Sequence, residues 1–249
     1  MQENSGLPNI KIVLVEPSHP GNIGSAARAM KVMGLSNLAL VKPKLFPDGK
    51  AKAMAAGADD ILENVQIFDS FNDAIADCLL VFGMSARKRR ISSELILPEK
   101  CAKLVAENHN SLSIGLIFGR EHSGLTNAEL DRCHYAVNIP TAEDFSSLNL
   151  GAAVQVICYE LRKTIFTYSE VITKPLKPSH MPASAQDMEL FFEHLKKIIT
   201  ATGFLRPENP KKLMRRIRKL FNKAEPDQNE INILRGILSS VEMKIDEER

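Results

Sequence analysis

An arginine that follows a glycine-rich turn is the first residue of this sequence whose position could serve chemistry. Gly21 and Gly24 come just after an apolar segment, and Arg28 follows about one turn into the helix expected to begin near Asn22. Glycines allow tight turns and close backbone approach, and the start of a helix offers free N–H groups to an anion. A guanidinium at this place could hold a phosphate through two hydrogen bonds. An ordinary turn explains the glycines equally well, so this segment alone does not decide a function.

The same turn does not match a dinucleotide-binding fingerprint. Its spacing is G-x-x-G, whereas the fingerprint needs G-x-G-x-x-G and an acidic residue about 20 residues further on, at the end of a second strand. The corresponding strand here ends in Val41, Lys42 and Pro43. A nucleotide-dependent oxidoreductase is therefore a disfavoured alternative.

Small residues and then a run of cations follow another apolar segment. Ser85 and Ala86, after Met84, leave room for a ligand, and every position from 87 to 90 is Lys or Arg. Such a run is often only a flexible, solvated loop, but it also suits a polyanion, which we favour. The candidate contacts to the polyanion are Arg87, Arg89 and Arg90.

Two further turns follow apolar segments. The first consists of Gly119 flanked by the opposite charges of Arg120 and Glu121. The second begins at Ile139 and leads to a helix start with several polar residues.

At that helix start, Ser146 or Ser147 can cap the helix, and the small residues that follow let it pack tightly. Asn149, just inside the helix, is better explained by a role for its side chain than by helix propensity. The plain alternative is a capped helix with a small-residue face.

These candidate residues share one place in the predicted fold. Short apolar runs alternate with helical stretches over residues 10–167, which is typical of an α/β domain. We expect buried parallel strands at residues 11–16, 37–42, 79–83, 112–118 and 135–139 and a weaker one near 65–68. We expect helices from about residue 22, over 72–78, after Pro98, after the capping box at Thr126, and over 147–167. Ligands of an open α/β sheet bind outside the carboxyl ends of the strands, where the candidate residues should gather.

The composition changes after the α/β region. We assign residues 1–168 to the α/β domain, 169–183 to a proline-containing linker and 184–249 to an all-helical extension. The extension should hold helices at about 184–202, which stops at Gly203, and at 210–223 and 227–245.

The middle helix of the extension is strongly basic. Its cations, with no acid among them, are Lys211, Lys212, Arg215, Arg216, Arg218, Lys219 and Lys223. An apolar stripe at helical spacing gives the helix one side for docking, so a solvated surface helix is the plain alternative. A membrane surface fits less well because the stripe lacks Trp. We favour contacts to RNA phosphates through Lys212, Arg215, Arg216, Arg218 and Lys219.

Bulk composition narrows the class of protein. The 249 residues are 44% hydrophobic and 25% charged, as in ordinary globular proteins. No apolar run is long enough to cross a bilayer, and residues 1–8 lack the features of a signal peptide. The 4 cysteines contain no C-x-x-C pair, so we expect neither disulfides nor a metal site and favour a cytoplasmic location. The net charge of +2 says little about partners.

Taken in order, the motifs resemble those of the SPOUT class of RNA methyltransferases and, within it, the TrmJ family of tRNA (cytidine/uridine) 2'-O-methyltransferases. The matching motifs lie at residues 21–24 with Arg28, at 85–87, at 118–121 with 124–125, and at 146–150. The resemblance is close from residue 10 to about 167 and continues at 201–204 and 234–238. One motif alone would be a weak signal, whereas the ordered set is a strong one.

The resemblance implies a fold, a methyl donor and a substrate. The fold is a parallel sheet with a trefoil knot over roughly residues 112–167, a rare exception to the rule against knots. The donor is S-adenosylmethionine, and the residues implied to bind it are Met84, Ser85, Ala86, Gly119, Arg120, Ile139, Ser146, Ser147 and Leu148. The implied reaction is 2'-O-methylation of cytidine or uridine at position 32 of the tRNA anticodon loop.

The resemblance also implies a homodimer in which Arg28 of one subunit faces the donor bound by the other. The residues expected at the interface are Ala26, Ala29, Met30, Met33, Ala152, Val156 and Tyr159. The alternative is that these side chains cover the sheet of their own subunit.

Methyl transfer to a ribose hydroxyl requires alignment of the reactants and stabilisation of charge, and it does not require a metal. A sulfonium methyl is already electrophilic, so the enzyme must align it with a ribose hydroxyl that loses its proton. Arginine is a poor general base, so Arg28 should instead stabilise the emerging alkoxide and hold a phosphate. Ser147 and Asn149 could orient the hydroxyl, Asn22 could contact RNA, and Glu121 could orient Arg28 or Arg120.

Two departures from the family concern substrate scope. Met84 stands where relatives often have Thr, and Phe145 where they often have Tyr, whose hydroxyl could position substrate. The remaining alternatives are a non-catalytic RNA-binding protein of the same fold, which would need a blocked donor pocket, and a methyltransferase for another RNA such as rRNA.

Overall fold

The computed structural model describes residues 7, 9–86, 94–144, 147–168, 181–205 and 213–247. Several residues named above lie outside these ranges, and they are Arg87, Arg89, Arg90, Phe145, Ser146, Lys211 and Lys212. Most of the predicted linker at 169–183 lies outside them as well.

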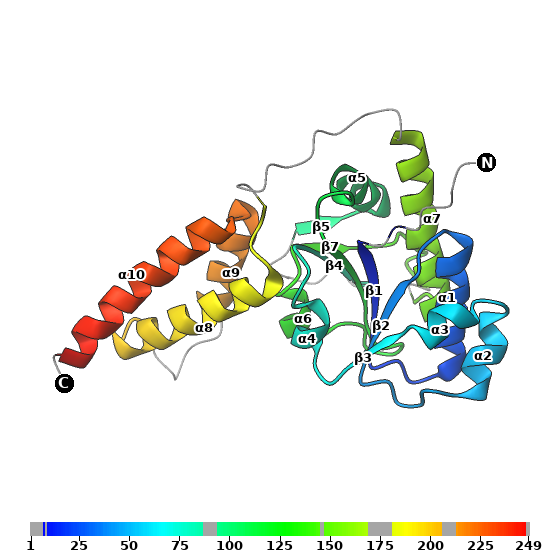
Figure 1. The fold of residues 1–249 in the computed structure, drawn as a ribbon, viewed down its shortest axis with the longest axis horizontal. Coiled ribbons are helices and arrows are strands. Elements are labelled where there is room, and N and C mark those ends of the chain that lie inside the picture. Colours follow the sequence, from blue (N-terminus) through cyan, green and yellow to red (C-terminus); the bar gives the residue numbers. More distant parts are fainter. Residues whose placement is uncertain are drawn as a thin grey trace.

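A parallel sheet of seven strands forms the centre of the α/β body (Figure 1). The strands are β1 (Ile10–Val15), β2 (Asn37–Val41), β3 (Gln66–Phe68), β4 (Leu80–Met84), β5 (Glu94–Ile96), β6 (Ile114–Phe118) and β7 (Tyr135–Val137). Their order is β3-β2-β1-β6-β4-β7-β5, and every pairing is parallel. β1, β4 and β6 are buried along their whole length, which explains why they are continuous apolar runs. The predicted parallel α/β sheet is confirmed.

Strand β5 is an element that the sequence pattern did not indicate. Of its residues only Ile96 is buried, while Glu94 and Leu95 are exposed at the edge of the sheet. So short a strand has too few residues for a periodic signal. Pairing with β7 holds it in place.

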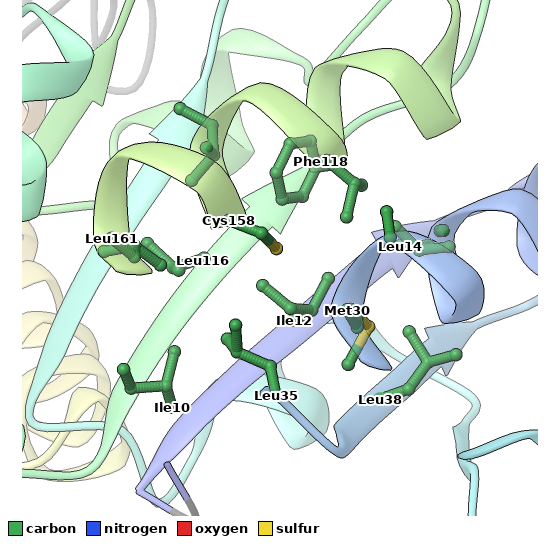
Figure 2. Packing of buried hydrophobic residues seen from close by; sticks show 14 of the residues in the cluster. Ile10, Ile12, Leu14, Met30, Leu35, Leu38, Leu116, Phe118, Cys158 and Leu161 are labelled. Atoms are coloured by element: carbon green, nitrogen blue, oxygen red, sulfur yellow. The ribbon is translucent and has the colours of Figure 1, made fainter. Parts of the chain in front are cut away.

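Helices cover both faces of the sheet. The helices of the α/β body are α1 (Pro20–Val32), α2 (Gly49–Ala55), α3 (Asp59–Glu63), α4 (Phe71–Ile75), α5 (Pro98–Asn108), α6 (Asn127–Leu130) and α7 (Leu150–Tyr168). A large apolar cluster joins one face of the sheet to α1, α5 and α7. In Figure 2, Ile12 of β1 lies between Met30 of α1 and Cys158 of α7. A second cluster joins the opposite face to α4 and α6.

Helices α2 and α3 were not predicted, and α2 changes the interpretation of the first glycine turn. A Cβ on Gly24 would lie 2.0 Å from the carbonyl oxygen of Ala51 in α2. The close approach that Gly24 allows is therefore to a neighbouring helix and not to a ligand.

The carboxyl-terminal region forms a module of three helices beside the α/β body (Figure 1). These are α8 (Ala185–Ala201), α9 (Leu213–Ala224) and α10 (Gln228–Glu247). Phe191, Phe192 and Phe221 pack together in its core. Gly203 has a φ of +74°, in the left-handed region expected of a residue that follows the end of a helix. The predicted all-helical composition is confirmed for the described residues.

The helical module is joined to the body by hydrogen bonds to backbone carbonyl groups of the body. The N–H of Ala185 donates to the carbonyl of Cys78 over 2.9 Å. The side chain of Asn222 donates to the carbonyl of Cys133 over 3.2 Å. The module is therefore docked on the body rather than only tethered to it.

All 4 cysteines are buried, and none is in a disulfide. Cys101 and Cys158 belong to the apolar cluster under α5 and α7, whereas Cys78 and Cys133 belong to the cluster on the opposite face. Within the described ranges, no helix has both the length and the apolar character that crossing a membrane requires.

Candidate active site

A cavity of about 210 Å³ opens beyond the carboxyl ends of β4, β6 and β7. Its wall consists of Met84, Ser85, Ala86, Phe118, Gly119, Arg120, Glu121, His122, Ser123, Gly124, Leu125, Val137, Ile139, Thr141, Ser147, Leu148, Leu150 and Ala153. Every predicted donor-contacting residue that the structure describes is in this wall. The sheet therefore brings together turns that are far apart in the sequence.

Three polar residues of the wall, His122, Ser123 and Thr141, were missed by sequence reasoning. His122 and Ser123 lie between Glu121 and Gly124, inside a motif already singled out. Thr141 lies two residues after Ile139. The sequence could have indicated these three residues only through their positions next to predicted site residues.

The loop after β6 is folded tightly on itself. A Cβ on Gly119 would lie 2.2 Å from backbone atoms of Gly124 and Leu125. Gly124 has a φ of +66°, which favours glycine, and its N–H donates to the Arg120 carbonyl over 2.8 Å. Both glycines are thus needed for the shape of this part of the wall.

The Arg120 guanidinium is held by two carboxylates of its own chain. Its Nε and Nη2 donate to Glu16 over 3.0 and 2.5 Å. Its Nη1 and Nη2 each donate to Glu129 over 3.1 Å. Hydrogen bonding to Glu16, and then to Glu129, raises the pKa of Arg120. Arg120 therefore lines the cavity while its charge is already paired.

The Glu121 carboxylate holds the start of α1. It accepts hydrogen bonds from the N–H groups of Ser18 and His19, from the Ser18 hydroxyl and from Asn22 Nδ2, at 3.0 to 3.2 Å. Burial alone would raise the pKa of Glu121, but these donors, with Asn22 foremost, lower it to about 2.

Within one chain the oxygens of Glu121 contact neither Arg28 nor Arg120, so the structure does not support the predicted role in orienting Arg120, and the role towards Arg28 stays a prediction. These oxygens are directed at the turn that precedes α1, and Arg120 is held by other carboxylates.

Asn149 joins this network to the start of α7. Its Oδ1 accepts from the N–H of Gly151 over 2.9 Å, and its Nδ2 donates to Asn22 Oδ1 over 2.9 Å. Because α7 begins at Leu150, Asn149 caps the helix. The expectation that Ser146 or Ser147 caps a helix that starts at residue 147 is corrected. The side chain of Asn149 therefore connects α7 to Glu121 through Asn22.

Arg28 lies on the exposed side of α1 and outside the cavity wall. It forms no hydrogen bond or ion pair with another described residue. In a single chain, then, the residue expected to act on substrate is not directed at the cavity.

The expected interface residues differ in exposure, and two of them, Met33 and Val156, are half-buried. Ala26, Ala29 and Met30 are buried against the sheet of their own chain, so the alternative interpretation holds for them. Tyr159 and Ala152 of α7 are exposed, and Tyr159 has 52% of its surface accessible. Val32, which was not predicted, is 61% exposed on α1.

The cations of α9 also divide into two groups. Arg215 forms a two-point ion pair with the buried Asp131, at 2.6 and 3.1 Å, and Arg218 forms one with Glu189, at 2.8 and 2.9 Å. In this structure both arginines dock the helix, and their expected contact with RNA stays a prediction. Arg216, Lys219 and Lys223 are exposed and form no ion pair with another described residue.

The described wall of the cavity mixes apolar and polar surface and offers no cluster of metal ligands. Among the described residues, no three His, Cys, Asp or Glu side chains gather as metal ligands would. The wall instead combines backbone of glycine turns, apolar side chains and small hydroxyl groups. Such a surface can hold a flat, partly apolar ligand.

The α/β body matches a known family over nearly its whole length. Residues 9–159 match the SpoU rRNA methylase family. The chain belongs to the SpoU methylase family. Residues 186–249 match a second family description, the C-terminal domain of the tRNA methyltransferase TrmJ. The helical module thus has a family assignment separate from that of the SpoU methylase body.

Relatives of this SpoU methylase resemble it along almost the whole chain. The tRNA (cytidine/uridine-2'-O-)-methyltransferase TrmJ of Klebsiella pneumoniae is 48% identical over 240 residues, which is 96% of this chain and 98% of the relative. The crystal structure of TrmJ from Z. mobilis has a TM-score of 0.81 at 32% identity and covers 93% and 98% of the two chains. A probable methylase family protein from Haemophilus influenzae has a TM-score of 0.64 at 43% identity, with 98% and 100% covered.

Proposed function

We propose that this chain transfers a methyl group from S-adenosylmethionine to the ribose 2'-hydroxyl of cytidine or uridine in tRNA. The observation that carries the proposal is the cavity at the strand ends, which unites the turns of the predicted donor site. The TrmJ name of full-length relatives supports the tRNA substrate. We place the modified nucleotide at position 32 of the anticodon loop and the enzyme in the cytoplasm.

The proposed donor suits the residues present. Met84, Ile139 and Leu148 offer apolar surface, and the tight turn at Gly119 brings backbone to the cavity wall. A more distant fold neighbour, the SpoU methyltransferase AviRb from Streptomyces viridochromogenes, was solved in complex with the cofactor AdoMet, at 23% identity and a TM-score of 0.50. When bound, S-adenosylmethionine supplies an electrophilic methyl group.

The chain's own residues then hold and orient the substrate. Asn149 and Ser147 lie exposed beside the cavity, where they can orient a ribose hydroxyl. Glu121, which is part of the cavity wall, acts by fixing Asn22 and through it Asn149. Arg28 stabilises the emerging alkoxide and holds the neighbouring phosphate.

The position of Arg28 leads us to propose a shared site in a homodimer. Arg28 lies outside the wall of its own cavity, on a helix whose outer surface exposes Val32. Exposed Tyr159 on α7 adds a second apolar contact. If α1 and α7 form the interface, Arg28 of each subunit completes the cavity of its partner. The predicted knot over residues 112–167 stays a prediction.

A methylation assay tests the substrate. Purified chain is incubated with S-adenosylmethionine and either an unmodified tRNA transcript or an rRNA fragment, and nucleosides are analysed by mass spectrometry. We expect 2'-O-methylcytidine or 2'-O-methyluridine in the tRNA anticodon loop only. The SpoU family description names rRNA, so methylation of the rRNA fragment alone would favour that second candidate. Donor binding without methylation of either RNA would favour a non-catalytic RNA-binding protein.

A further inference from the structure

The loop after β6 is fastened to two other elements through one side chain. Arg120 contributes to the cavity wall, and its backbone pairs with Gly124 across the loop. Its guanidinium donates to Glu16 and to Glu129 with two hydrogen bonds each. Fork-shaped pairs of this kind fix direction as well as distance. The orientation of the loop is thereby tied to the positions of the two carboxylates.

The two carboxylates come from two different segments of the chain. Glu16 directly follows β1 and has a φ of +46°, in the left-handed region that non-glycine residues rarely adopt. Glu129 lies in α6, where it also accepts from the N–H of Thr126 over 2.6 Å. The Glu129 side chain is 12% exposed and that of Arg120 is 23% exposed. The Glu16 side chain is 38% exposed. The pair of Arg120 with Glu129 is therefore the part that is largely shielded from water, where such bonds are stronger.

The charges of this cluster argue against a direct contact between Arg120 and an anionic ligand. Two carboxylates share one guanidinium, so the cluster carries a net negative charge. A ligand carboxylate that approached Arg120 would have to displace Glu16 or Glu129. The loop wall, in contrast, depends on Arg120 staying where it is.

We propose that Glu16 and Glu129 are positioning residues for the donor cavity, which act by holding Arg120 and with it the loop of residues 119–125. Arg120 itself shapes the cavity and does not bind the carboxylate of the donor. This inference rests on the proposed donor, and its test separates the two.

The test is calorimetric titration of two ligands that differ in their carboxylate. S-adenosylhomocysteine carries an amino-acid group with a carboxylate, whereas 5'-methylthioadenosine lacks that group. If Glu16 positions the loop, Glu16→Gln weakens both ligands by a similar factor, about tenfold, which corresponds to about 1.4 kcal/mol. If Arg120 binds the carboxylate directly, Glu16→Gln removes a competing anion, so S-adenosylhomocysteine binds more tightly and 5'-methylthioadenosine is unchanged.

Further variants distinguish a loss of loop positioning from a general loss of folding stability. Glu129→Gln and Arg120→Lys should repeat the loss for both ligands, because lysine lacks the fork that spans two carboxylates. In turnover assays these variants should raise the KM for the donor, with kcat at saturating donor and the KM for tRNA nearly unchanged. The matched control is Glu242→Gln in the helical module, where a carboxylate also holds two partners, His194 and Lys197. It should leave the affinity for both ligands as it is.

Two outcomes overturn the inference. One is unchanged affinity of Glu16→Gln and Glu129→Gln for both ligands, and the other is tighter S-adenosylhomocysteine binding by Glu16→Gln alone. In both, the unaltered chain binds the ligands. If the unaltered chain binds neither ligand, the proposed donor is wrong.

Discussion

At the scale of single residues, Asn149 does two jobs with one amide group. Its oxygen caps α7 and its nitrogen reaches Asn22. Loss of a cap costs about 1 kcal/mol. Asn149→Ala should therefore lower the free energy of unfolding by about 1 kcal/mol and reduce turnover.

The control for this prediction is Asn149→Asp. Aspartate keeps the capping oxygen but cannot donate to Asn22, so stability should recover while turnover stays low. Denaturant unfolding and methylation rates measure the two effects. If Asn149→Asp restored both, the contact with Asn22 would have no part in the reaction.

The low pKa of Glu121 predicts a pH dependence of stability. Because the folded pKa of about 2 lies below the ordinary value of 4.5, Glu121 contributes stability above pH 4.5, and that contribution is lost as the pH falls towards 2. Glu121→Gln should be less stable at neutral pH, and the difference from the unaltered chain should shrink below pH 4.5. Thermal melts of both proteins at several pH values check this. A difference that stays constant down to pH 2 would contradict the assignment.

At the scale of elements, the sequence revealed those with strong periodic or continuous apolar signals. β1, β4 and β6 were predicted because they are buried on both sides. β5 and α2 were missed because elements this short bury few side chains. The partners of Glu121 could not be predicted either, since Ser18 lies 103 residues away and only the folded sheet brings the two together.

In the basic helix α9, too, the sequence does not show which charged side chains are used in packing. Composition alone grouped all its cations, but packing separates docking arginines from exposed ones. Arg216→Gln and Lys219→Gln should each lower the slope of log affinity for tRNA against log salt by about 0.7–0.9, if each loses one phosphate contact. Filter binding at several salt concentrations measures the slopes.

Arg215→Gln should behave differently from these two variants. It removes the two-point ion pair between Arg215 and the buried Asp131, so it should destabilise the docked module by about 1–3 kcal/mol. If the docked Arg215 makes no phosphate contact, the salt slope should change little. Equal slope changes for Arg215→Gln and Arg216→Gln would mean that docking does not separate the two residues.

At the scale of the whole molecule, the proposed shared site can be tested by mixing subunits. Arg28→Ala should lack methyl transfer yet bind donor nearly as the unaltered chain does. Gly119→Trp should be inactive because no side chain fits beside Gly124 and Leu125. After subunit exchange, each heterodimer should regain one working site, so activity should return towards half per heterodimer.

The control for the mixing experiment is each variant exchanged with itself, which should stay inactive. Exchange is verified by two affinity tags, so that mixed dimers are counted directly. Proven exchange without recovered activity would show that each subunit uses its own Arg28.

The alkylation rates of the buried cysteines report how often the structure around each of them opens. Burial raises the pKa of Cys78 and of Cys158 to about 12, so an alkylating reagent reacts with either thiol only when the surrounding structure opens. Cys78 and Cys133 also bind the helical module through their carbonyl groups, whereas Cys101 and Cys158 lie under α5 and α7. Alkylation rates, followed for each cysteine by peptide mass spectrometry, therefore measure the opening of the two regions separately. If tRNA binding releases the helical module, Cys78 and Cys133 will be alkylated faster, while the alkylation rates of Cys101 and Cys158 will not change.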